Sequence, residues 1–118
     1  MCGIVGFIDS NGRMSEDQAS DLISSMCKKV IHRGPDNFGS WTERENGIYF
    51  GHQRLSILDL SPSGHQPMSY GDKRYWITYN GEVYNFIELR KDLESLGHRF
   101  CSDSDTEVIL ASYIEWVI

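Results

Sequence analysis

The sequence predicts an α+β fold, in which short strands and amphipathic helices alternate along the chain. Three observations support this class. The N-terminus is an apolar segment, and residues 38–58 contain two strand-like stretches joined by a turn. Segments before and after these stretches show helical periodicity. The 118 residues are enough for one domain with a single hydrophobic core. Hydrophobic residues make up 40% and charged residues 24%, which is ordinary for a globular protein.

The N-terminal part predicts a strand followed by a helix. Residues 3–9 form a short apolar segment, and the sequence Asp-Ser-Asn-Gly at 9–12 favours a turn. A helix is expected to begin at Ser15, because Gln18 completes a capping box three residues later. Apolar residues then recur with the 3, 1, 3, 1 spacing of one helical face, namely Ala19, Leu22, Ile23, Met26, Cys27, Val30 and Ile31. Cys27 is therefore assigned to packing.

The middle of the chain predicts strands. Residues 38–44 and 48–58 are separated by Glu-Asn-Gly at 45–47, which is typical of a hairpin turn. Residues 61–64 indicate a loop. A further strand is expected over residues 74–79, which are rich in Tyr, Trp, Ile and Thr, and Asn80-Gly81 ends it with a turn.

Two helices are predicted in the last third of the chain. For the first of them, Asn85 is a candidate N-cap, with Glu88 at the third position of the helix, and Gly97 is a candidate C-cap glycine. One face of this helix carries Phe86, Leu89, Leu93 and Leu96. A short strand is expected at 98–101, followed by a helix start at 102–105 with Asp105 as N-cap. Residues 108–118 are apolar nearly all round, so we expect burial on several sides, by a partner or, as we favour, by further chain of a longer protein.

Composition excludes several classes of function. The formal net charge is −6 and no run of five like charges occurs, so a nucleic-acid partner is not expected. No apolar run approaches the roughly 18 residues of a membrane span, and the N-terminus lacks the features of a signal peptide. Three scattered cysteines favour reduced thiols in the cytoplasm. Only His52 and His65 lie close together among possible ligands, so no metal site is expected.

Cys2 is a candidate nucleophile. Removal of Met1 would leave one residue with both a thiol and an α-amine, whose unperturbed pKa is about 7.7–8.0. Such an amine can act as the general base for the thiol beside it. Taken alone, a cysteine at position two is better explained as an accident of sequence.

Four other segments carry polar residues suited to chemistry. They are His-Arg-Gly-Pro-Asp at 32–36, Gly-His-Gln-Arg-Leu-Ser-Ile at 51–57, Tyr-Asn-Gly-Glu-Val-Tyr-Asn at 79–85 and Ser-Asp-Thr-Glu at 104–107. Each has a structural explanation when taken singly, such as a turn at Gly34-Pro35 or a helix cap at Asp105.

Together and in this order, these segments resemble the glutamine amidotransferase (glutaminase) domain of the N-terminal-nucleophile class, and most closely that of glutamine-hydrolysing asparagine synthetases. The resemblance runs from Cys2 to about Trp116. It implies a four-layer αββα sandwich of two antiparallel sheets flanked by helices. It also implies that residues 1–118 are an incomplete glutaminase domain, with the C-terminal synthetase domain absent from this chain.

The resemblance also implies roles for the catalytic residues. Cys2 resembles the nucleophile that attacks the carboxamide of glutamine, and its α-amine resembles the base. Asn80, through its side-chain amide, and Gly81, through its backbone N–H, resemble the oxyanion hole. Two donors of this kind stabilise the negative charge of a tetrahedral intermediate.

Three further residues resemble the part of the site that binds the amino-acid end of glutamine. Arg54 resembles the guanidinium that binds the α-carboxylate, a geometry that arginine satisfies with two hydrogen bonds. Glu82 and Asp105 resemble the acidic partners of the α-ammonium group. His52 is expected to have a structural role, as are Arg33 and Asp36.

The implied reaction is hydrolysis of L-glutamine to glutamate and ammonia through a thioester on Cys2. In the complete protein, a C-terminal domain would use the ammonia, with ATP and magnesium, to convert aspartate to asparagine. This chain lacks the Ser-Gly-Gly-x-Asp-Ser type of nucleotide loop, so we expect it to need no cofactor. Two alternatives remain open: an amidotransferase with another acceptor, such as a surface-polysaccharide sugar, and a non-catalytic truncated module that retains Met1. A homodimer also remains open.

Overall fold

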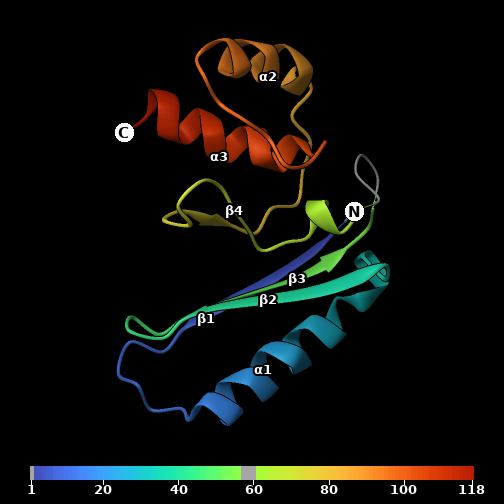
Figure 1. Ribbon diagram of the computed structural model, residues 1–118. Coiled ribbons are helices and arrows are strands. Elements are labelled where there is room, and N and C mark those ends of the chain that lie inside the picture. Colours follow the sequence, from blue (N-terminus) through green and yellow to red (C-terminus); the bar gives the residue numbers. More distant parts are fainter. Residues whose placement is uncertain (1, 57–60) are drawn as a thin grey trace.

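The computed structural model describes residues 2–56 and 61–118, and it has the predicted α+β architecture. In these residues, helix α1 covers one face of a three-stranded sheet, and a two-stranded ribbon separates the other face from two further helices (Figure 1). The elements are β1 (Gly3–Ile8), α1 (Glu16–Lys29), β2 (Asn37–Glu43), β3 (Ile48–Arg54), β4 (Met68–Ser69), β5 (Trp76–Ile77), α2 (Phe86–Ser95) and α3 (Asp105–Trp116). Two antiparallel sheets between helices agree with the expected sandwich.

The three-stranded sheet has the order β1-β3-β2 with antiparallel pairing throughout. Strands β2 and β3 form the predicted hairpin. In its turn, the Glu43 carboxylate accepts the backbone N–H groups of Glu45 and Asn46, and Gly47 adopts a φ of 67°. Such a positive φ suits glycine, because it has no Cβ. The Asn-Gly signal in the sequence therefore marks the turn correctly.

Strand β3 supplies both faces of the sheet, because successive side chains point to opposite sides. Tyr49 packs with α1 in the first hydrophobic cluster. A Cβ atom on Gly51 would lie 2.5 Å from the Cys27 sulfur, so glycine permits α1 to approach the sheet closely. The alternate residues His52 and Arg54 therefore face the ribbon. This alternation brings His52 and Arg54 to the side on which the cavity lies.

Helix α1 begins as predicted and ends earlier than predicted. Ser15 and Gln18 form the capping box. The first cluster comprises Ala19, Ile23 and Tyr49, packed against Val5, Phe7 and Met26. The helix ends at Lys29, and Val30 is its C-cap. Ile31 is exposed in a following 3-10 turn, so assigning Ile31 to the packed stripe was wrong.

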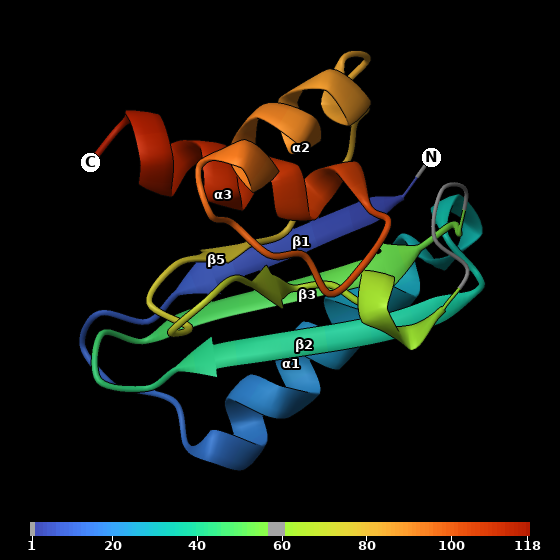
Figure 2. The same ribbon diagram turned by 45° about the horizontal axis from the view of Figure 1, so that its top comes forward.

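Helices α2 and α3 lie together on the side of the ribbon away from α1 (Figure 2), and a second hydrophobic cluster joins them. Its fully buried members are Leu93, Val108 and Ala111, packed against Tyr70, Phe86, Leu89 and Phe100. Leu96, which shares the predicted helix face, is exposed because the helix ends at Ser95. Gly97 follows with a φ of 98°, as expected of a glycine after a helix.

Several predicted element ends differ from the structure. Asn85 precedes α2 but makes no side-chain capping hydrogen bond. Ser104, not Asp105, caps α3, because its side chain accepts the Thr106 N–H. The expected strand at 98–101 is absent from the described residues, where this segment forms no strand pairing.

Two predicted strands are shorter than expected. Strand β3 ends at Arg54 rather than at residue 58, and residues 57–58 lie outside the described residues. Only Trp76–Ile77 of the predicted strand 74–79 is paired. Its partner β4, at Met68–Ser69, was not predicted because two residues carry no recognisable periodicity.

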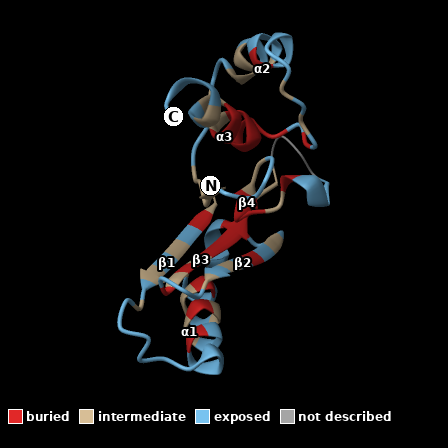
Figure 3. Ribbon diagram, turned by 60° about the vertical axis from the view of Figure 1, so that its left-hand side comes forward, coloured by how far each residue is buried: buried red, intermediate tan, exposed pale blue. Residues whose placement is uncertain are grey.

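Helix α3 is buried along its first half and exposed towards its end (Figure 3). The buried residues extend from Asp105 to Ala111, whereas Tyr113, Trp116, Val117 and Ile118 are exposed. Burial along the whole of residues 108–118 is therefore not observed. Among the described residues, no helix is long and apolar enough to cross a membrane.

Candidate active site

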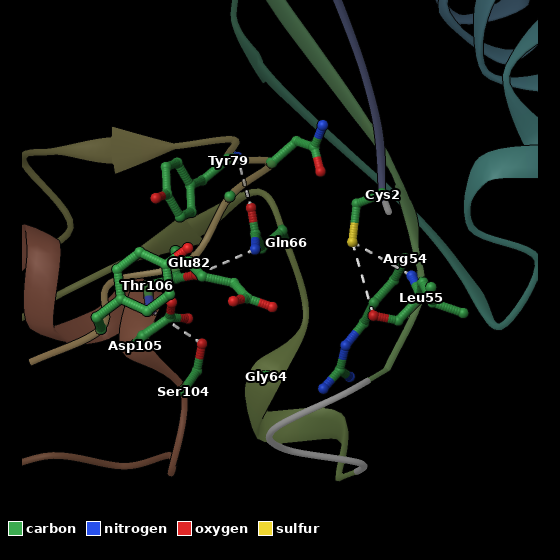
Figure 4. Close-up of a pocket in the computed structure, with 13 residues that line it drawn as sticks. Cys2, Arg54, Leu55, Gly64, Gln66, Tyr79, Glu82, Ser104, Asp105 and Thr106 are labelled. Atoms are coloured by element: carbon green, nitrogen blue, oxygen red, sulfur yellow. Dashed lines mark hydrogen bonds between the residues drawn. The ribbon is translucent and has the colours of Figure 1, made fainter. Parts of the chain in front are cut away.

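A cavity of about 300 Å³ lies between the N-terminal end of β1, the C-terminal end of β3 and the start of α3 (Figure 4). It is lined by Cys2, Arg54, Leu55, Gly64, Gln66, Tyr79, Asn80, Gly81, Glu82, Tyr84, Ser104, Asp105 and Thr106. All six residues singled out from the sequence are in this set, although they come from four separate segments of the chain. The structure thus brings every predicted site residue to one cavity.

Strand pairing brings Cys2 next to Arg54. The register of the antiparallel β1–β3 pair matches Gly3 with Gln53, so the next residues along, Cys2 and Arg54, lie opposite each other at the end of the ladder. The half-buried Cys2 sulfur accepts the backbone N–H of Leu55 at 3.3 Å. Its thiol lies 3.6 Å from the Leu55 carbonyl oxygen, which can accept the S–H. The sulfur is therefore held against the end of β3.

Arg54 is nearly buried, with 7% of its surface exposed. Its guanidinium donates to the backbone carbonyl of Ser61 at 2.8 Å. Within residues 2–56 and 61–118, no carboxylate forms a salt bridge with Arg54. A buried guanidinium ordinarily has an anionic partner. Its position in the cavity is suited to a carboxylate group of a ligand.

Two charged residues of the 32–36 segment hold the backbone around the cavity. Arg33 donates from Nε to the carbonyl oxygen of Cys2 at 3.1 Å. The Asp36 carboxylate accepts the N–H of Ser56 at 2.9 Å, and its own N–H donates to the carbonyl of Arg54. Both contacts fit the structural role expected for these residues, with no Arg33–Asp36 salt bridge among the described side chains.

The segment from Tyr79 to Glu82 forms the cavity wall that carries the predicted oxyanion donors. Gly81 lies against the ring of Tyr79, because a Cβ on Gly81 would be 2.6 Å from the Tyr79 hydroxyl oxygen. Asn80 is half-buried, whereas Gly81 and Glu82 are exposed. Burial raises the pKa of Tyr79, and the negative charges of Asp105 and Glu82 raise it further.

Asp105 lies in the first turn of α3 and is 6% exposed. One of its carboxylate oxygens accepts the backbone N–H of Val83 at 2.9 Å. Figure 4 shows Asp105 and Glu82 on one side of the cavity and Cys2 with Arg54 on the other. The cavity therefore carries a cation and a thiol on one wall and two carboxylates on the opposite wall.

His52 lies behind the cavity and is only 1% exposed. Its Nε2 lies 3.2 Å from the carbonyl oxygen of Tyr79; because a carbonyl can only accept, Nε2 carries the proton. Burial lowers the pKa of His52, as do the nearby His65 and Arg54, against the opposing effect of the Tyr79 hydrogen bond. Nδ1 has no hydrogen-bond partner among the described residues. The structural role expected for His52 agrees with this buried, neutral state.

Sequence reasoning missed the buried Gln66, and it named the buried Glu107 only within the 104–107 segment, without a role. Gln66, in the cavity wall, joins Tyr79 to Thr106, as described below. Glu107, next to the site, accepts the N–H groups of Cys101 and Ser102 and the Ser102 hydroxyl. Glutamine beside proline and glutamate in a helix are common surface patterns, so nothing local distinguishes them. Within the described residues, no group of three or more His, Cys, Asp or Glu side chains is arranged to hold a metal ion.

The fold and the site together define the class of protein. A thiol directly before the first strand, amide and backbone donors on the facing segment, and opposite charges on the two walls of the cavity, in a fold with two antiparallel sheets, are those of an amidotransferase of the N-terminal-nucleophile type. Comparison with known proteins agrees. A model of the glutamine amidotransferase domain matches residues 1–117. The chain belongs to this family of enzyme domains.

Named relatives refine the family. The chain is 47% identical over 113 residues to asparagine synthetase [glutamine-hydrolyzing] 1 of Bacillus subtilis, covering 96% of this chain and 17% of the relative. It is 44% identical over 119 residues to synthetase 3 of the same organism, covering 98% and 18%. A putative asparagine synthetase 2 of Methanocaldococcus jannaschii is 40% identical over 129 residues, covering 96% and 24%. The chain thus spans less than a quarter of the length of these relatives.

Proposed function

We propose that this chain hydrolyses L-glutamine to glutamate and ammonia through a γ-glutamyl thioester on Cys2. The strongest support is that residues from distant segments line one cavity of about 300 Å³, namely Cys2, Arg54, Asn80, Gly81 and Asp105. That size suits a single amino acid, and small-molecule sites begin at roughly this volume.

Thioester formation would require that Met1 is removed, so that the α-amine of Cys2 is free. The amine takes the thiol proton, directly or through water, and the sulfur attacks the carboxamide carbon of glutamine. As the C–S bond forms, the carbonyl electron pair moves to oxygen. The Asn80 amide and the Gly81 N–H stabilise the resulting oxyanion. When the C–O double bond re-forms, the C–N bond breaks, and the nitrogen takes the proton from the ammonium and leaves as ammonia.

Hydrolysis of the thioester completes the cycle. The α-amine takes a proton from a water molecule as its oxygen attacks the thioester carbon, and the same donors stabilise the second oxyanion. Collapse of this intermediate breaks the C–S bond and releases glutamate, while the sulfur leaves as a thiolate. The ammonium then returns its proton to the thiolate. One water is consumed for each glutamine.

Substrate binding follows from the charges of the two cavity walls. The guanidinium of Arg54 binds the α-carboxylate of glutamine, and Asp105 with Glu82 binds the α-ammonium group. This arrangement requires an α-amino acid with a free carboxylate and a free ammonium. It therefore favours glutamine over peptides that contain it.

The names of the relatives support a use for the ammonia. They are glutamine-hydrolysing asparagine synthetases, so we propose that the released ammonia passes to a synthetase domain that converts aspartate to asparagine with ATP and magnesium. Those two cofactors would act outside this chain. The glutaminase reaction proposed here uses only the chain's own residues and water.

The test is glutamine hydrolysis by the full-length gene product and its Cys2→Ala variant. The intact mass must first show loss of Met1. We then expect ammonia release from glutamine in the parent and none above background in the variant. Cys101→Ala is the matched control, because Cys101 is an exposed cysteine that does not line the cavity, and it should retain activity. Undiminished hydrolysis in Cys2→Ala would contradict the assignment, and retained Met1 with no activity would favour a non-catalytic module.

A further inference from the structure

We propose that Gln66 and His52 are positioning residues that hold Tyr79 from both sides and thereby aim the Asn80–Gly81 pair at the reacting carbonyl. We call this pair of side chains the Tyr79 clamp. The inference rests on the proposed glutaminase function, and it concerns residues that do not themselves touch the reacting atoms.

Both backbone polar groups of Tyr79 are bound by buried side chains from other segments. The Tyr79 N–H donates to Oε1 of Gln66 at 2.7 Å, and the Tyr79 carbonyl accepts from Nε2 of His52 at 3.2 Å. Gln66 is 7% exposed, and His52 is more deeply buried still. Tyr79 directly precedes Asn80. The orientation of the peptide that leads into the proposed oxyanion pair is therefore set by two side-chain hydrogen bonds.

These bonds replace the backbone ladder that would otherwise fix the segment. Strand β5 ends at Ile77, and α2 begins at Phe86, so the residues between them have no regular secondary structure. Partly buried N–H and C=O groups need partners, and here side chains supply them. The hydroxyl of Thr78 adds a weaker bond, of 3.4 Å, to the Gly51 carbonyl. Without the clamp, the backbone of Tyr79 would lose both of these hydrogen bonds, and the donors would depend on the Thr78 bond and on the bond from the Val83 N–H to Asp105.

The amide of Gln66 also contacts the start of α3, which forms a second part of the same cavity wall. Its Nε2 donates to the Thr106 hydroxyl at 3.2 Å, next to Asp105 (Figure 4). The backbone of Gln66 is also closely packed, because a Cβ on Gly39 would lie 1.9 Å from the backbone carbonyl oxygen of Gln66. One planar amide thus fixes the spacing between the segment with the oxyanion donors and the start of α3. Side chains supported in this way keep a site in its productive geometry.

His52 is suited to a fixed role because its protonation state is defined. The Tyr79 carbonyl requires a proton on Nε2, and burial disfavours the charged ring. The neutral imidazole then offers one donor in one direction. A residue that keeps a single tautomer can hold a backbone carbonyl in one orientation.

The expected size of the effect follows from what the clamp positions. Removing an oxyanion donor lowers turnover by about 10²–10³-fold, and a shift of about 1 Å in a catalytic group costs on the order of 10²-fold. Loss of one half of the clamp should lower kcat by about 10–100-fold. Since neither residue of the clamp carries the charges that bind the α-carboxylate and α-ammonium, KM should stay within about threefold.

The experiment compares Gln66→Met, His52→Leu and His52→Gln in the full-length gene product, with Tyr70→Phe as control. Gln66→Met and His52→Leu remove a hydrogen bond to Tyr79, and we expect the loss in kcat given above. His52→Gln places an amide donor near the position of Nε2 and should restore most of the lost kcat. Tyr70→Phe removes a partly buried hydrogen bond to His98 away from the cavity, and its kcat should remain that of the parent.

A second measurement distinguishes misplaced oxyanion donors from a general disordering of the site. A glutamine analogue with an electrophilic γ-carbonyl needs the oxyanion donors to modify Cys2, whereas iodoacetamide alkylates the thiol without forming an oxyanion. We expect Gln66→Met to slow the first reaction by about the same factor as kcat and to leave the second unchanged. Equal slowing of both reactions, or unchanged kcat in an active protein, would overturn the clamp and leave the glutaminase assignment standing. Activity that survives Cys2→Ala would overturn both.

Discussion

The Asp105 carboxylate accepts the backbone N–H of Val83 at 2.9 Å, which joins the first turn of α3 to the segment that follows Gly81 and Glu82. The same residue lines the cavity. Because Ser104 is the N-cap of α3, the Asp105 carboxylate is not needed to cap the helix. One oxygen of its carboxylate therefore accepts the N–H of the loop, while the residue remains part of the cavity wall. This position suits a partner for an ammonium group.

Replacing Asp105 by asparagine separates these two contacts. The amide oxygen in Asp105→Asn can still accept the Val83 N–H, so the thermal midpoint should change little. Loss of the charge should raise KM for glutamine by roughly 10–100-fold, since a hydrogen bond to a charged group contributes about 1.5–3 kcal/mol. Steady-state kinetics and thermal unfolding on the same preparation check both parts. An unchanged KM would exclude Asp105 from ammonium binding.

Arg54→Ala and Arg54→Lys test the proposed carboxylate site. The alanine variant should raise KM by on the order of 10²-fold with a smaller change in kcat, because it removes a paired charge from the substrate complex. Lysine keeps the charge but not the two parallel N–H donors, so it should recover only part of the affinity. Substrate titration of glutaminase activity measures the series. A KM equal to that of the parent in Arg54→Ala contradicts this role.

Asn80→Ala should act on turnover rather than on binding. We expect kcat to fall by about 10²–10³-fold with little change in KM, as for the loss of other oxyanion-hole donors. Asn85→Ala is a matched control, because Asn85 is exposed, does not line the cavity and makes no side-chain capping bond. It should behave like the parent. A change in KM alone would mean that Asn80 only binds substrate.

Glu107→Ala should destabilise the fold. Glu107 is 4% exposed, and its carboxylate accepts two backbone N–H groups and the Ser102 hydroxyl. Truncation leaves the two donors of buried Ser102 and the N–H of Cys101 without a partner, which should cost about 3–5 kcal/mol of unfolding free energy. Urea unfolding measures the loss, with the exposed Glu88→Gln as control. A cost below about 1 kcal/mol would show that water replaces the carboxylate easily.

The buried His52 predicts a pH dependence of stability. Its pKa in the folded protein lies below the unperturbed value of about 6.5, chiefly through burial. Between these two values the unfolded chain binds more protons than the folded one, so stability falls as pH drops below about 6.5. Unfolding free energies at several pH values should therefore show a smaller acid loss in His52→Gln. Parallel profiles for parent and variant would contradict this origin.

Local signals in the sequence predicted the parts of the fold that depend on neighbouring residues. The capping box at Ser15 and Gln18, and the hairpin turn at Gly47, were both confirmed. The cap of α3 was assigned to the wrong residue, because Ser104 and Asp105 are equally good caps and tertiary contacts decide between them. The strand expected at 98–101 was wrong, because no described strand lies beside it to pair with.

The residues of the candidate site also fall into those found from the sequence and those that only the structure reveals. The six residues named from the resemblance all line the cavity, so the resemblance to the glutaminase family was sufficient to find them. Gln66 escaped notice, because its partners Tyr79 and Thr106 are 13 and 40 residues away along the chain. A buried amide that joins such distant segments has no periodicity or motif. Its role follows only from tertiary structure.

The two hydrophobic clusters have no residue in common, and residues from both sides of the ribbon that separates them line the cavity. Arg54 belongs to the sheet that packs on α1, whereas Asp105 begins the helix that packs on α2. A bound amino acid that pairs with both residues would act as a cross-link between two separately packed halves. Ligand present at about 100 times its Kd would add about 2.7 kcal/mol to the unfolding free energy. A bound ligand would therefore also stabilise the association of the two halves of the fold.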